Sequence, residues 1–323
     1  MKKSINKVRD MMNGYKASYL LITASKLGIF DVLSERAETS KNIGSKLEIE
    51  SDKIELVLNA LVALGLIEKE EDKYSLTEYK SVLQSNSIDS QVGYFNYAIS
   101  MADKWKNMIC TIQKETKLNE HQNDDGSIKE FLYAMNTNAI SQAVYLANQY
   151  DFSGQSIIDV GAGYGTYSMI IANKFSDAKF EVFDLPTVEN ILTENVIEAK
   201  LNKQISVLSG DYRKGLPQKR YDSVFLFAII HQEEEREVER LLKNIYDRLN
   251  EGGKLYVSSY FLEENRTEPY FSAMFALEML VRYGKGKVYT HKEINAKLMN
   301  AGYKKIVRDD LLPGPATLYI AKK

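Results

Sequence analysis

Three short motifs in the second half of the chain carry residues suited to a nucleotide-like ligand. The turn Gly161-Ala162-Gly163-Tyr164-Gly165 follows an apolar run at 157–160, and such a turn lets the backbone approach a ligand at a helix N-terminus. About 20 residues later, Phe183-Asp184-Leu185-Pro186 offers a carboxylate for ribose hydroxyls. Gly210-Asp211-Tyr212 then offers a polar and an apolar side chain for an adenine. Together the motifs predict an adenosine-containing cofactor.

The glycine spacing distinguishes between cofactors. Dinucleotide folds use a G-x-G-x-x-G pattern, but here Thr166 occupies the position of the third glycine. Asp159, just before the turn, is placed to accommodate a cationic, sulfonium-bearing amino acid. The pattern therefore favours S-adenosylmethionine over NAD. The predicted cofactor-binding set also includes Ala162, Leu185 and Phe227.

His231 is the residue that we predict to act as a general base. It follows the apolar run 224–230, which predicts a strand whose end faces the cofactor. An imidazole can take a proton near neutral pH, and methyl transfer to oxygen requires an aligned and deprotonated hydroxyl. The alternative is a histidine that only caps the strand end. His121 and His291 have no such context, and we expect surface or capping positions for them.

The acidic run at 233–237 raises the question of a metal site. Acidic residues also suit the first turn of a helix, where the helix dipole is positive, and we favour this interpretation. The three histidines lie far apart in the sequence, and the single cysteine, Cys110, offers no partner for them. We therefore predict no metal site.

These residues require an alternating arrangement of strands and helices to position them. Apolar runs predict strands, and periodic segments between them predict helices. The predicted strands are 156–161, 179–184, 205–208, 223–230 and 254–261; the helices are 166–175, 187–200, 233–250, 270–283 and 291–300; and 305–307 with 317–320 form a closing hairpin. This order predicts a parallel sheet covered by helices on both faces.

The first part of the chain has a different pattern. It predicts a helix at 12–30, a helix at 41–47 capped by Thr39-Ser40, and a helix at 53–64 capped by Ser51-Asp52. Residues 66–69 and 73–76 then predict a hairpin, which completes the order of a winged helix. A transcriptional regulator is an alternative, but the second helix of the pair is apolar and acidic, which disfavours DNA binding. Packing against another subunit or domain is the better interpretation.

Large side chains gather between these two parts, in several predicted helices from about residue 94 to residue 150. They form an interhelical core or, in a more specific interpretation, part of the wall of a substrate pocket. The predicted pocket residues are Trp105, Phe131, Met135, Met274 and Glu278.

Length and composition limit the class of protein. The chain of 323 residues suggests two domains, and 44% hydrophobic with 27% charged residues is typical of a globular protein. A net charge of −2 gives no electrostatic case for nucleic acid or an anionic membrane. A lone cysteine fits a reducing compartment, and no apolar run predicts a signal or a membrane span, so we expect a soluble, cytoplasmic protein. We predict three segments: a winged-helix domain at residues 1–92, a helical connecting and pocket segment at 93–150, and an α/β cofactor-binding domain at 151–323.

The motifs together resemble those of the two-domain small-molecule O-methyltransferases, the family of plant phenolic, bacterial polyketide and acetylserotonin O-methyltransferases. The resemblance rests on Phe131-x-x-Ala134-Met135, Asp159-Val160-Gly161-Ala162-Gly163, Asp184-Leu185-Pro186, Gly210-Asp211 and Ile229-Ile230-His231. It implies a Rossmann-like α/β domain with a mostly parallel seven-stranded sheet, preceded by a mainly helical winged-helix domain that forms a homodimer. It also implies S-adenosyl-L-methionine as cofactor and His231 as general base for a small aromatic acceptor.

The sequence departs from the family pattern around the histidine. The family usually has His-Asp-Trp, whereas this chain has His231-Gln232-Glu233. Two carboxylates that commonly orient the histidine are replaced by Ser259 and Val288. Two explanations follow: the acceptor is acidic enough to need little help, or another group is the base. A protein that binds the cofactor without transferring methyl is the alternative function.

Overall fold

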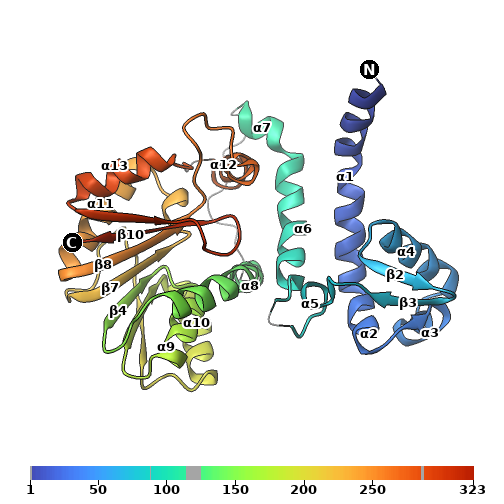
Figure 1. Ribbon diagram of the computed structural model, residues 1–323, viewed down its shortest axis with the longest axis horizontal. Helices are drawn as coiled ribbons and strands as arrows, with labels where there is room; N and C mark the ends of the chain where they lie inside the picture. The colour runs from blue at the N-terminus through green and yellow to red at the C-terminus, as the bar shows by residue number, and fades with distance from the viewer. Residues whose placement is uncertain (1, 88, 114–124, 285–286) are drawn as a thin grey trace. The chain divides into compact units, whose positions relative to one another are not determined.

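The computed structural model describes residues 2–87, 89–113, 125–284 and 287–323 (Figure 1). His121 lies outside these ranges. The chain divides into two compact units, residues 1–102 and 103–323, and each is described by itself.

The first unit begins with two helices, α1 (Lys2–Lys26) and α2 (Ile29–Glu35), where the sequence predicted one. The predicted single helix at 12–30 is therefore wrong. Gly28 separates the two with φ of +78°, a left-handed conformation that glycine adopts without steric cost and that ends the helical path. Ile29 and Phe30 of α2 are buried in the core of this unit.

The remaining elements of the first unit follow the winged-helix order. Helices α3 (Ser40–Leu47) and α4 (Ser51–Ala63) precede the antiparallel pair β2 (Ile67–Glu70) and β3 (Lys73–Leu76). Thr39 caps α3 as predicted, accepting a hydrogen bond from the Asn42 amide at 3.2 Å. The predicted Ser51 cap is wrong, because α4 already includes Ser51 and its N-cap is Glu50. A short strand, β1 (Glu38–Thr39), also pairs with β3. Helices α5 (Lys80–Leu83) and α6 (Val92–Lys106) follow, and the last four residues of α6 belong to the second unit.

The second unit contains a seven-stranded sheet in the order β6-β5-β4-β7-β8-β10-β9. Its first five strands in that order are parallel, whereas β10 runs antiparallel to both β8 and β9. This confirms the mostly parallel sheet and the closing hairpin. The strands are β4 (Ser156–Val160), β5 (Lys179–Asp184), β6 (Ile205–Ser209), β7 (Tyr221–Phe227), β8 (Leu249–Ser259), β9 (Lys305–Asp309) and β10 (Thr317–Lys322).

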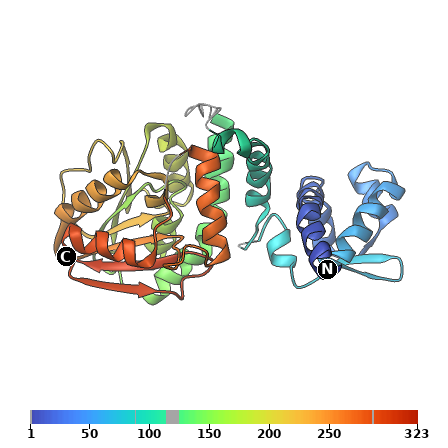
Figure 2. The ribbon, with the colours of Figure 1, turned by 90° about the horizontal axis from the view of Figure 1, so that it is seen from above.

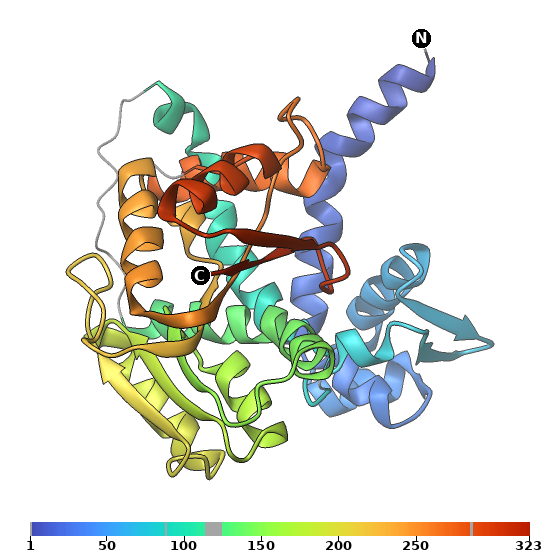
Figure 3. The same ribbon diagram turned by 60° about the vertical axis from the view of Figure 1, so that its left-hand side comes forward.

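Helices cover both faces of this sheet (Figures 1 and 3). On one face lie α8 (Asp125–Gln149), α9 (Thr166–Lys174) and α10 (Pro186–Glu198), and on the other lie α11 (Glu235–Arg248) and α13 (His291–Ala301). Neighbouring strand residues point to opposite faces, as the pleat requires: Ile157 packs with the first set and Ile158 with the second. Helix α11 begins within the acidic run, which confirms that the run starts a helix. Helices α7 (Met108–Ile112) and α12 (Tyr270–Tyr283) complete the unit.

The fourth parallel strand ends earlier than predicted. Strand β7 stops at Phe227, and Ala228 adopts a φ of +54°, which turns the chain away from the sheet. Residues Ile230–Gln232 then form a single 3₁₀ turn, η1. His231 therefore lies in this turn, four residues beyond the strand.

Among the described residues no single helix is long and apolar enough to span a membrane, although α1 and α2, which are bent by 62° against each other, reach that length and hydropathy as a pair.

Candidate active site

The glycine turn lies at the carboxyl end of β4 and leads into α9. Gly161, Gly163 and Gly165 have φ values of +74°, +56° and +84°, which side-chain-bearing residues rarely adopt. A Cβ atom at Gly161 would come within 2.4 Å of the Cδ1 atom of Ile229, so even alanine would clash there. The turn thus brings bare backbone to the sheet edge where ligands of such folds bind.

Asp184 ends β5 beside this turn. One of its carboxylate oxygens accepts a hydrogen bond from the Gly163 amide and the other accepts one from the Leu185 amide, both at 2.7 Å. Burial raises the pKa of the carboxyl, whereas these two amide donors lower it. A carboxylate has about four acceptor positions, so two remain for ligand hydroxyls. The strand end therefore holds an oriented acceptor next to the glycine turn.

The third motif lies after β6. The Gly210 amide donates to the backbone oxygen of Asp184 at 2.8 Å, and a Cβ at Gly210 would lie 2.5 Å from the Phe183 ring. One oxygen of Asp211 accepts from both the amide and the side chain of Arg213, at 2.9 and 3.0 Å. Tyr212 donates its hydroxyl to Glu233 at 2.7 Å and so links this motif to the residues after η1.

Asp159 is the most deeply buried carboxylate of the predicted cofactor set, with 2% of its surface exposed. Ser168 of α9 donates its hydroxyl to it at 2.8 Å. Burial raises its pKa to about 7, although the Ser168 bond opposes the shift. Asp159 therefore holds α9 to β4 beneath the turn, and its contact with a cofactor stays a prediction.

An aromatic pair lies beside the same strand ends. Phe227, predicted as a cofactor contact, is 6% exposed, and its ring centroid lies 4.3 Å from that of Tyr167. The hydroxyl of Tyr167 donates to Gln142 on α8 at 2.7 Å. Tyr167 was not among the predicted site residues, although its position in the first turn of α9, after the glycine turn, is a signal that could have identified it.

The residues present fit an adenosine-containing cofactor. Carboxylates follow β5 and β6, and glycine backbone lies at the end of β4, all at one edge of the sheet because the three strands are parallel. At Gly161 and Gly210 a side chain would collide with Ile229 and Phe183 beside this edge, so the backbone there requires glycine.

His231 lies in η1 and exposes only 5% of its surface. Its Nδ1 is 3.0 Å from the hydroxyl oxygen of Ser259, and its backbone oxygen accepts from the Lys287 amide at 3.2 Å. Burial, followed by the positive charge of Arg282, lowers the pKa of the imidazole to about 3. The histidine is therefore neutral at neutral pH, and its orienting partner is a hydroxyl where the family commonly has a carboxylate.

Aromatic rings that the sequence analysis did not single out surround this imidazole. Phe275 meets it edge-on with centroids 4.7 Å apart, and Tyr260 lies 6.0 Å from it. Phe271 and Phe275 also contact Tyr260, at 4.9 and 4.4 Å. Phe271 and Phe275 are one helical turn apart on α12, which is the signal that could have identified them.

The predicted pocket residues do not all come together. Phe131 lies on α8, and the Arg282 guanidinium stacks 4.3 Å from its ring centroid; Figure 2 shows α12 alongside α8. Glu278, half-buried on α12, has its pKa raised by burial and lowered in part by Arg282. Trp105 and Met135 are half-buried, on α6 and α8. Met274 is 39% exposed, because it is adjacent to Phe275 in sequence and points to another side of α12.

The other acidic residues near His231 in sequence have separate partners. Glu263 lies 3.7 Å from His291, and Glu264 accepts from the Lys292 amide at 3.1 Å. Val288 is buried and apolar. His291 opens α13, and its Nδ1 is 2.8 Å from the Tyr319 hydroxyl. No group of three or more potential metal ligands comes together in the part of the chain that the structure describes.

Comparisons with known proteins agree on one family. The model of the O-methyltransferase domain matches residues 109–304, and that of the O-methyltransferase dimerisation domain matches residues 9–86. The S-adenosyl-L-methionine-dependent methyl transferase PigF of Serratia sp. is 27% identical over 97% of this chain and 94% of its own. The 3-hydroxy-5-methyl-1-naphthoate 3-O-methyltransferase of Streptomyces sahachiroi is 25% identical over 91% and 88%. The structure of human N-acetylserotonin methyltransferase with SAM superimposes with a TM-score of 0.88, at 22% identity over 99% and 97% of the two chains, and shows the same fold.

Proposed function

This chain belongs to the O-methyltransferase family of S-adenosylmethionine-dependent enzymes, and we propose that it methylates a hydroxyl group of a small aromatic molecule with His231 as the base. The observation that carries the proposal is the arrangement at one sheet edge. Glycine backbone and two strand-end carboxylates lie there, and His231 follows the neighbouring strand β7.

S-adenosylmethionine, when bound, supplies a methyl group on a positively charged sulfur. Gly161 and Gly163 would present backbone to it, and Asp184 would accept hydrogen bonds from the ribose hydroxyls through its remaining acceptor positions. Asp211 and Tyr212 would hold the adenine. The position of these residues at one edge of the sheet supports these roles.

In this proposal His231 aligns and deprotonates the acceptor hydroxyl. If Nδ1 carries the proton and donates to Ser259, then Nε2 is free to accept the hydrogen of the acceptor hydroxyl. That hydrogen bond aligns the oxygen, and Nε2 takes the proton as the oxygen gains its methyl group. Because Ser259 is uncharged, it stabilises the resulting imidazolium less than a carboxylate would. The site therefore suits a hydroxyl that is already acidic, such as a phenol.

The aromatic nature of the acceptor is supported by the rings around His231 and by the relatives. Phe275 and Tyr260 lie beside the imidazole, and Phe271 packs against both of these rings. The relative from Streptomyces sahachiroi is named for a hydroxylated naphthoate, a fused aromatic acceptor. For this chain we infer an aromatic acceptor, but not that particular compound.

In this proposal the first unit joins two chains into a homodimer. Its match to a dimerisation domain supports a homodimer. We propose that residues 1–92 form the dimerisation domain and residues 151–323 the catalytic domain. Residues 93–150 connect the two and contribute to the substrate pocket. The single cysteine, Cys110, fits a reducing compartment, and we propose a cytoplasmic location.

The cofactor half of the proposal is tested by isothermal titration calorimetry with S-adenosylmethionine. We expect the wild-type chain to bind, and Asp184→Ala to lower the affinity at least about 100-fold, because it removes charge-assisted hydrogen bonds. Asp177→Asn, which removes an exposed carboxylate outside the site, is the matched control and leaves binding unchanged. Absence of binding by the wild-type chain at millimolar cofactor contradicts the proposal.

The catalytic half is tested by the rate of methyl transfer to phenolic acceptors, followed by product mass. His231→Ala lowers kcat about 100-fold, near the lower end for general bases, because the buried imidazole is a weak base. His291→Ala is the control: this histidine contacts the Tyr319 hydroxyl instead of the candidate site, and its loss leaves kcat unchanged. The rate shows no inflection near pH 6.5, since the imidazole stays neutral down to a pKa of about 3. Equal loss in both histidine variants contradicts the assignment of His231.

A further inference from the structure

The turn η1, which carries His231, is anchored at three points. Before it, the Ala228 amide donates to a backbone oxygen of β8 at 2.9 Å. Within it, the backbone oxygen of His231 accepts from the Lys287 amide at 3.2 Å. Directly after it, the carboxylate of Glu233 accepts from the Tyr212 hydroxyl at 2.7 Å. The first two anchors join backbone to backbone, whereas the third depends on a side chain of the third predicted cofactor motif.

Glu233 is suited to hold the end of this turn. It is the C-terminal capping residue of η1, two positions after His231, and only 9% of its surface is exposed. A carboxylate removed from water needs hydrogen bonds to offset the lost hydration, and Tyr212 provides one. Burial, followed by the contact with Glu233, raises the pKa of Tyr212 above its usual value, so the hydroxyl stays protonated and donates. The pair therefore fixes the Glu233 side chain and, with it, the end of the turn.

Tyr212 connects this pair to the predicted adenine position. It comes two residues after Gly210, whose amide donates to the backbone oxygen of Asp184 at 2.8 Å. Its ring is half-buried and packs against the core on the α11 side of the sheet. An adenine that covered the exposed part of this ring would restrict its motion, and the hydrogen bond would pass that restriction on to Glu233.

We propose that Glu233 is a positioning residue that, through Tyr212, fixes the turn of His231 when the cofactor binds. The inference rests on the proposed function, because it takes Tyr212 as an adenine contact and His231 as the base. The cofactor restricts Tyr212, the hydroxyl of Tyr212 holds Glu233, and the turn between Ala228 and Glu233 becomes ordered. His231 then meets the acceptor already aligned, so acceptor binding costs less conformational entropy.

Amide hydrogen exchange, followed by mass spectrometry, tests this coupling without any acceptor. The peptide to follow is 228–234, which includes the Gln232 amide that donates to the Ile229 oxygen at 3.0 Å. The probe is S-adenosylhomocysteine at a saturating concentration, which calorimetry defines for each variant. In the wild-type chain we expect this probe to slow exchange in the peptide at least about tenfold.

Three variants separate the hydrogen bond from the residues that make it. Tyr212→Phe keeps the ring but removes the hydroxyl, so the probe still binds and the slowing falls below about twofold. Glu233→Leu removes the acceptor and has the same effect, while it leaves the Tyr212 side chain intact toward the cofactor. Glu233→Gln keeps an oxygen that accepts from the hydroxyl, so it retains most of the wild-type response.

Tyr221→Phe is the matched control, because it also removes a hydroxyl that donates to a carboxylate, that of Glu181. Tyr221 begins β7, six residues before Phe227 and about 20 Å along the strand, so this variant keeps the wild-type response. The inference is overturned if the probe does not slow exchange in the wild type, if either Tyr212→Phe or Glu233→Leu responds as the wild type does, if Glu233→Gln loses the response as Glu233→Leu does, or if Tyr221→Phe also loses it. A wild-type chain that does not bind S-adenosylhomocysteine would instead contradict the proposed function, so the two failures are distinguishable.

Discussion

At the scale of single residues, Asp159 and His231 are two buried titratable groups whose pKa values move in opposite senses. Burial raises the pKa of Asp159 from 3.8 to about 7, so the folded chain holds a proton that the unfolded chain loses. Burial lowers the pKa of His231 from 6.5 to about 3, so the unfolded chain holds the extra proton. As pH rises, Asp159 therefore lowers the free energy of unfolding between about pH 4 and 7, while His231 raises it between about pH 3 and 6.5.

Asp159→Asn separates these two contributions. Asparagine has no carboxyl proton to lose, so the variant should gain stability relative to the wild type as pH rises from about 4 to about 7. A shift of about three pKa units corresponds to a relative gain on the order of 4 kcal/mol. Urea unfolding at several pH values in the absence of cofactor measures it, with Asp177→Asn as the exposed control. Parallel stability curves for the wild type and Asp159→Asn would show that Asp159 is ionised in the folded chain.

Residues whose roles follow from local backbone geometry could be predicted from the sequence, whereas long-range partners could not. Gly161, Gly163 and Asp184 lie together because a glycine turn and the next strand end must meet at one sheet edge. The family resemblance placed Ser259 where a partner of His231 usually lies, and in the structure it approaches the imidazole from β8. Phe275, on a helix 44 positions later in the sequence, was not predicted. No spacing rule connects such residues before the chain has folded. Even so, the absence of a carboxylate partner was visible in the sequence.

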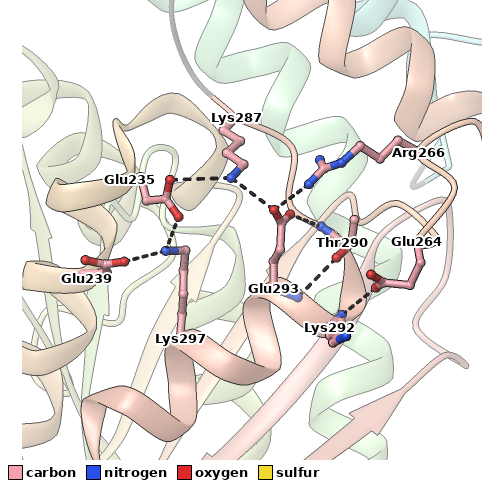
Figure 4. Close-up of polar contacts among 9 residues, drawn as sticks. All are labelled: Glu235, Glu239, Glu264, Arg266, Lys287, Thr290, Lys292, Glu293 and Lys297. Atoms are coloured by element: carbon pink, nitrogen blue, oxygen red, sulfur yellow. Dashed lines mark hydrogen bonds and ion pairs between the residues drawn. The ribbon is translucent and has the colours of Figure 1, made fainter.

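At the scale of elements, a charged network joins α11, α13 and the segment before α13 (Figure 4). Lys297 of α13 exposes 7% of its side chain, and its ammonium lies 2.7 Å from both Glu235 and Glu239 of α11. Lys287 lies 3.6 Å from Glu235 and 3.1 Å from Glu293, while its amide donates to the backbone oxygen of His231. The network thus connects two helices of one face to the turn that carries the candidate base.

Two substitutions at Lys297 distinguish packing from charge in this network. The carboxylates of Glu235 and Glu239 are more than half exposed, so they remain hydrated when the ammonium is lost. Lys297→Met keeps the buried stem and should cost about 1 kcal/mol. Lys297→Ala also leaves a cavity against Tyr289 and should cost about 3 kcal/mol.

The free energy of unfolding in urea checks both values. Lys243→Met provides the control, because it removes an exposed partner of Asp247 one turn away on α11 and should cost less than about 0.5 kcal/mol. If Lys297→Met costs as much as Lys297→Ala, the charge and not the stem carries the stabilisation.

Element boundaries could be predicted at β5 and α12, whose predicted bounds are the observed ones. They failed where one backbone conformation overrides a continuous apolar pattern. Gly28 divides a predicted helix into α1 and α2, and Ala228 ends β7 before its apolar run is complete. In both places a positive φ, not a change of residue polarity, terminates the element.

At the scale of the whole molecule, the change in residue pattern predicted a helical first part and an α/β second part, and the family resemblance implied a homodimer, which the match to a dimerisation domain supports. Within the first unit, α1 carries five apolar side chains that are each 40% or more exposed: Ile5, Val8, Met12, Tyr15 and Tyr19. Their spacing of three and four residues forms one apolar stripe, which is typical of a helix that packs against a partner.

The double variant Met12→Glu with Tyr15→Glu tests whether this stripe forms the dimer interface. In a homodimer built on α1, both carboxylates would have to leave water for an apolar interface, which costs several kcal/mol for each unpaired charge. Light scattering after gel filtration should therefore give about twice 36.8 kDa for the wild type and 36.8 kDa for the variant. Asn6→Glu with Asn13→Glu adds the same charge to the opposite side of α1 and should leave the dimer intact. A dimeric Met12→Glu, Tyr15→Glu chain would place the interface on another surface and leave the apolar stripe exposed in the assembly, which the burial of apolar area disfavours.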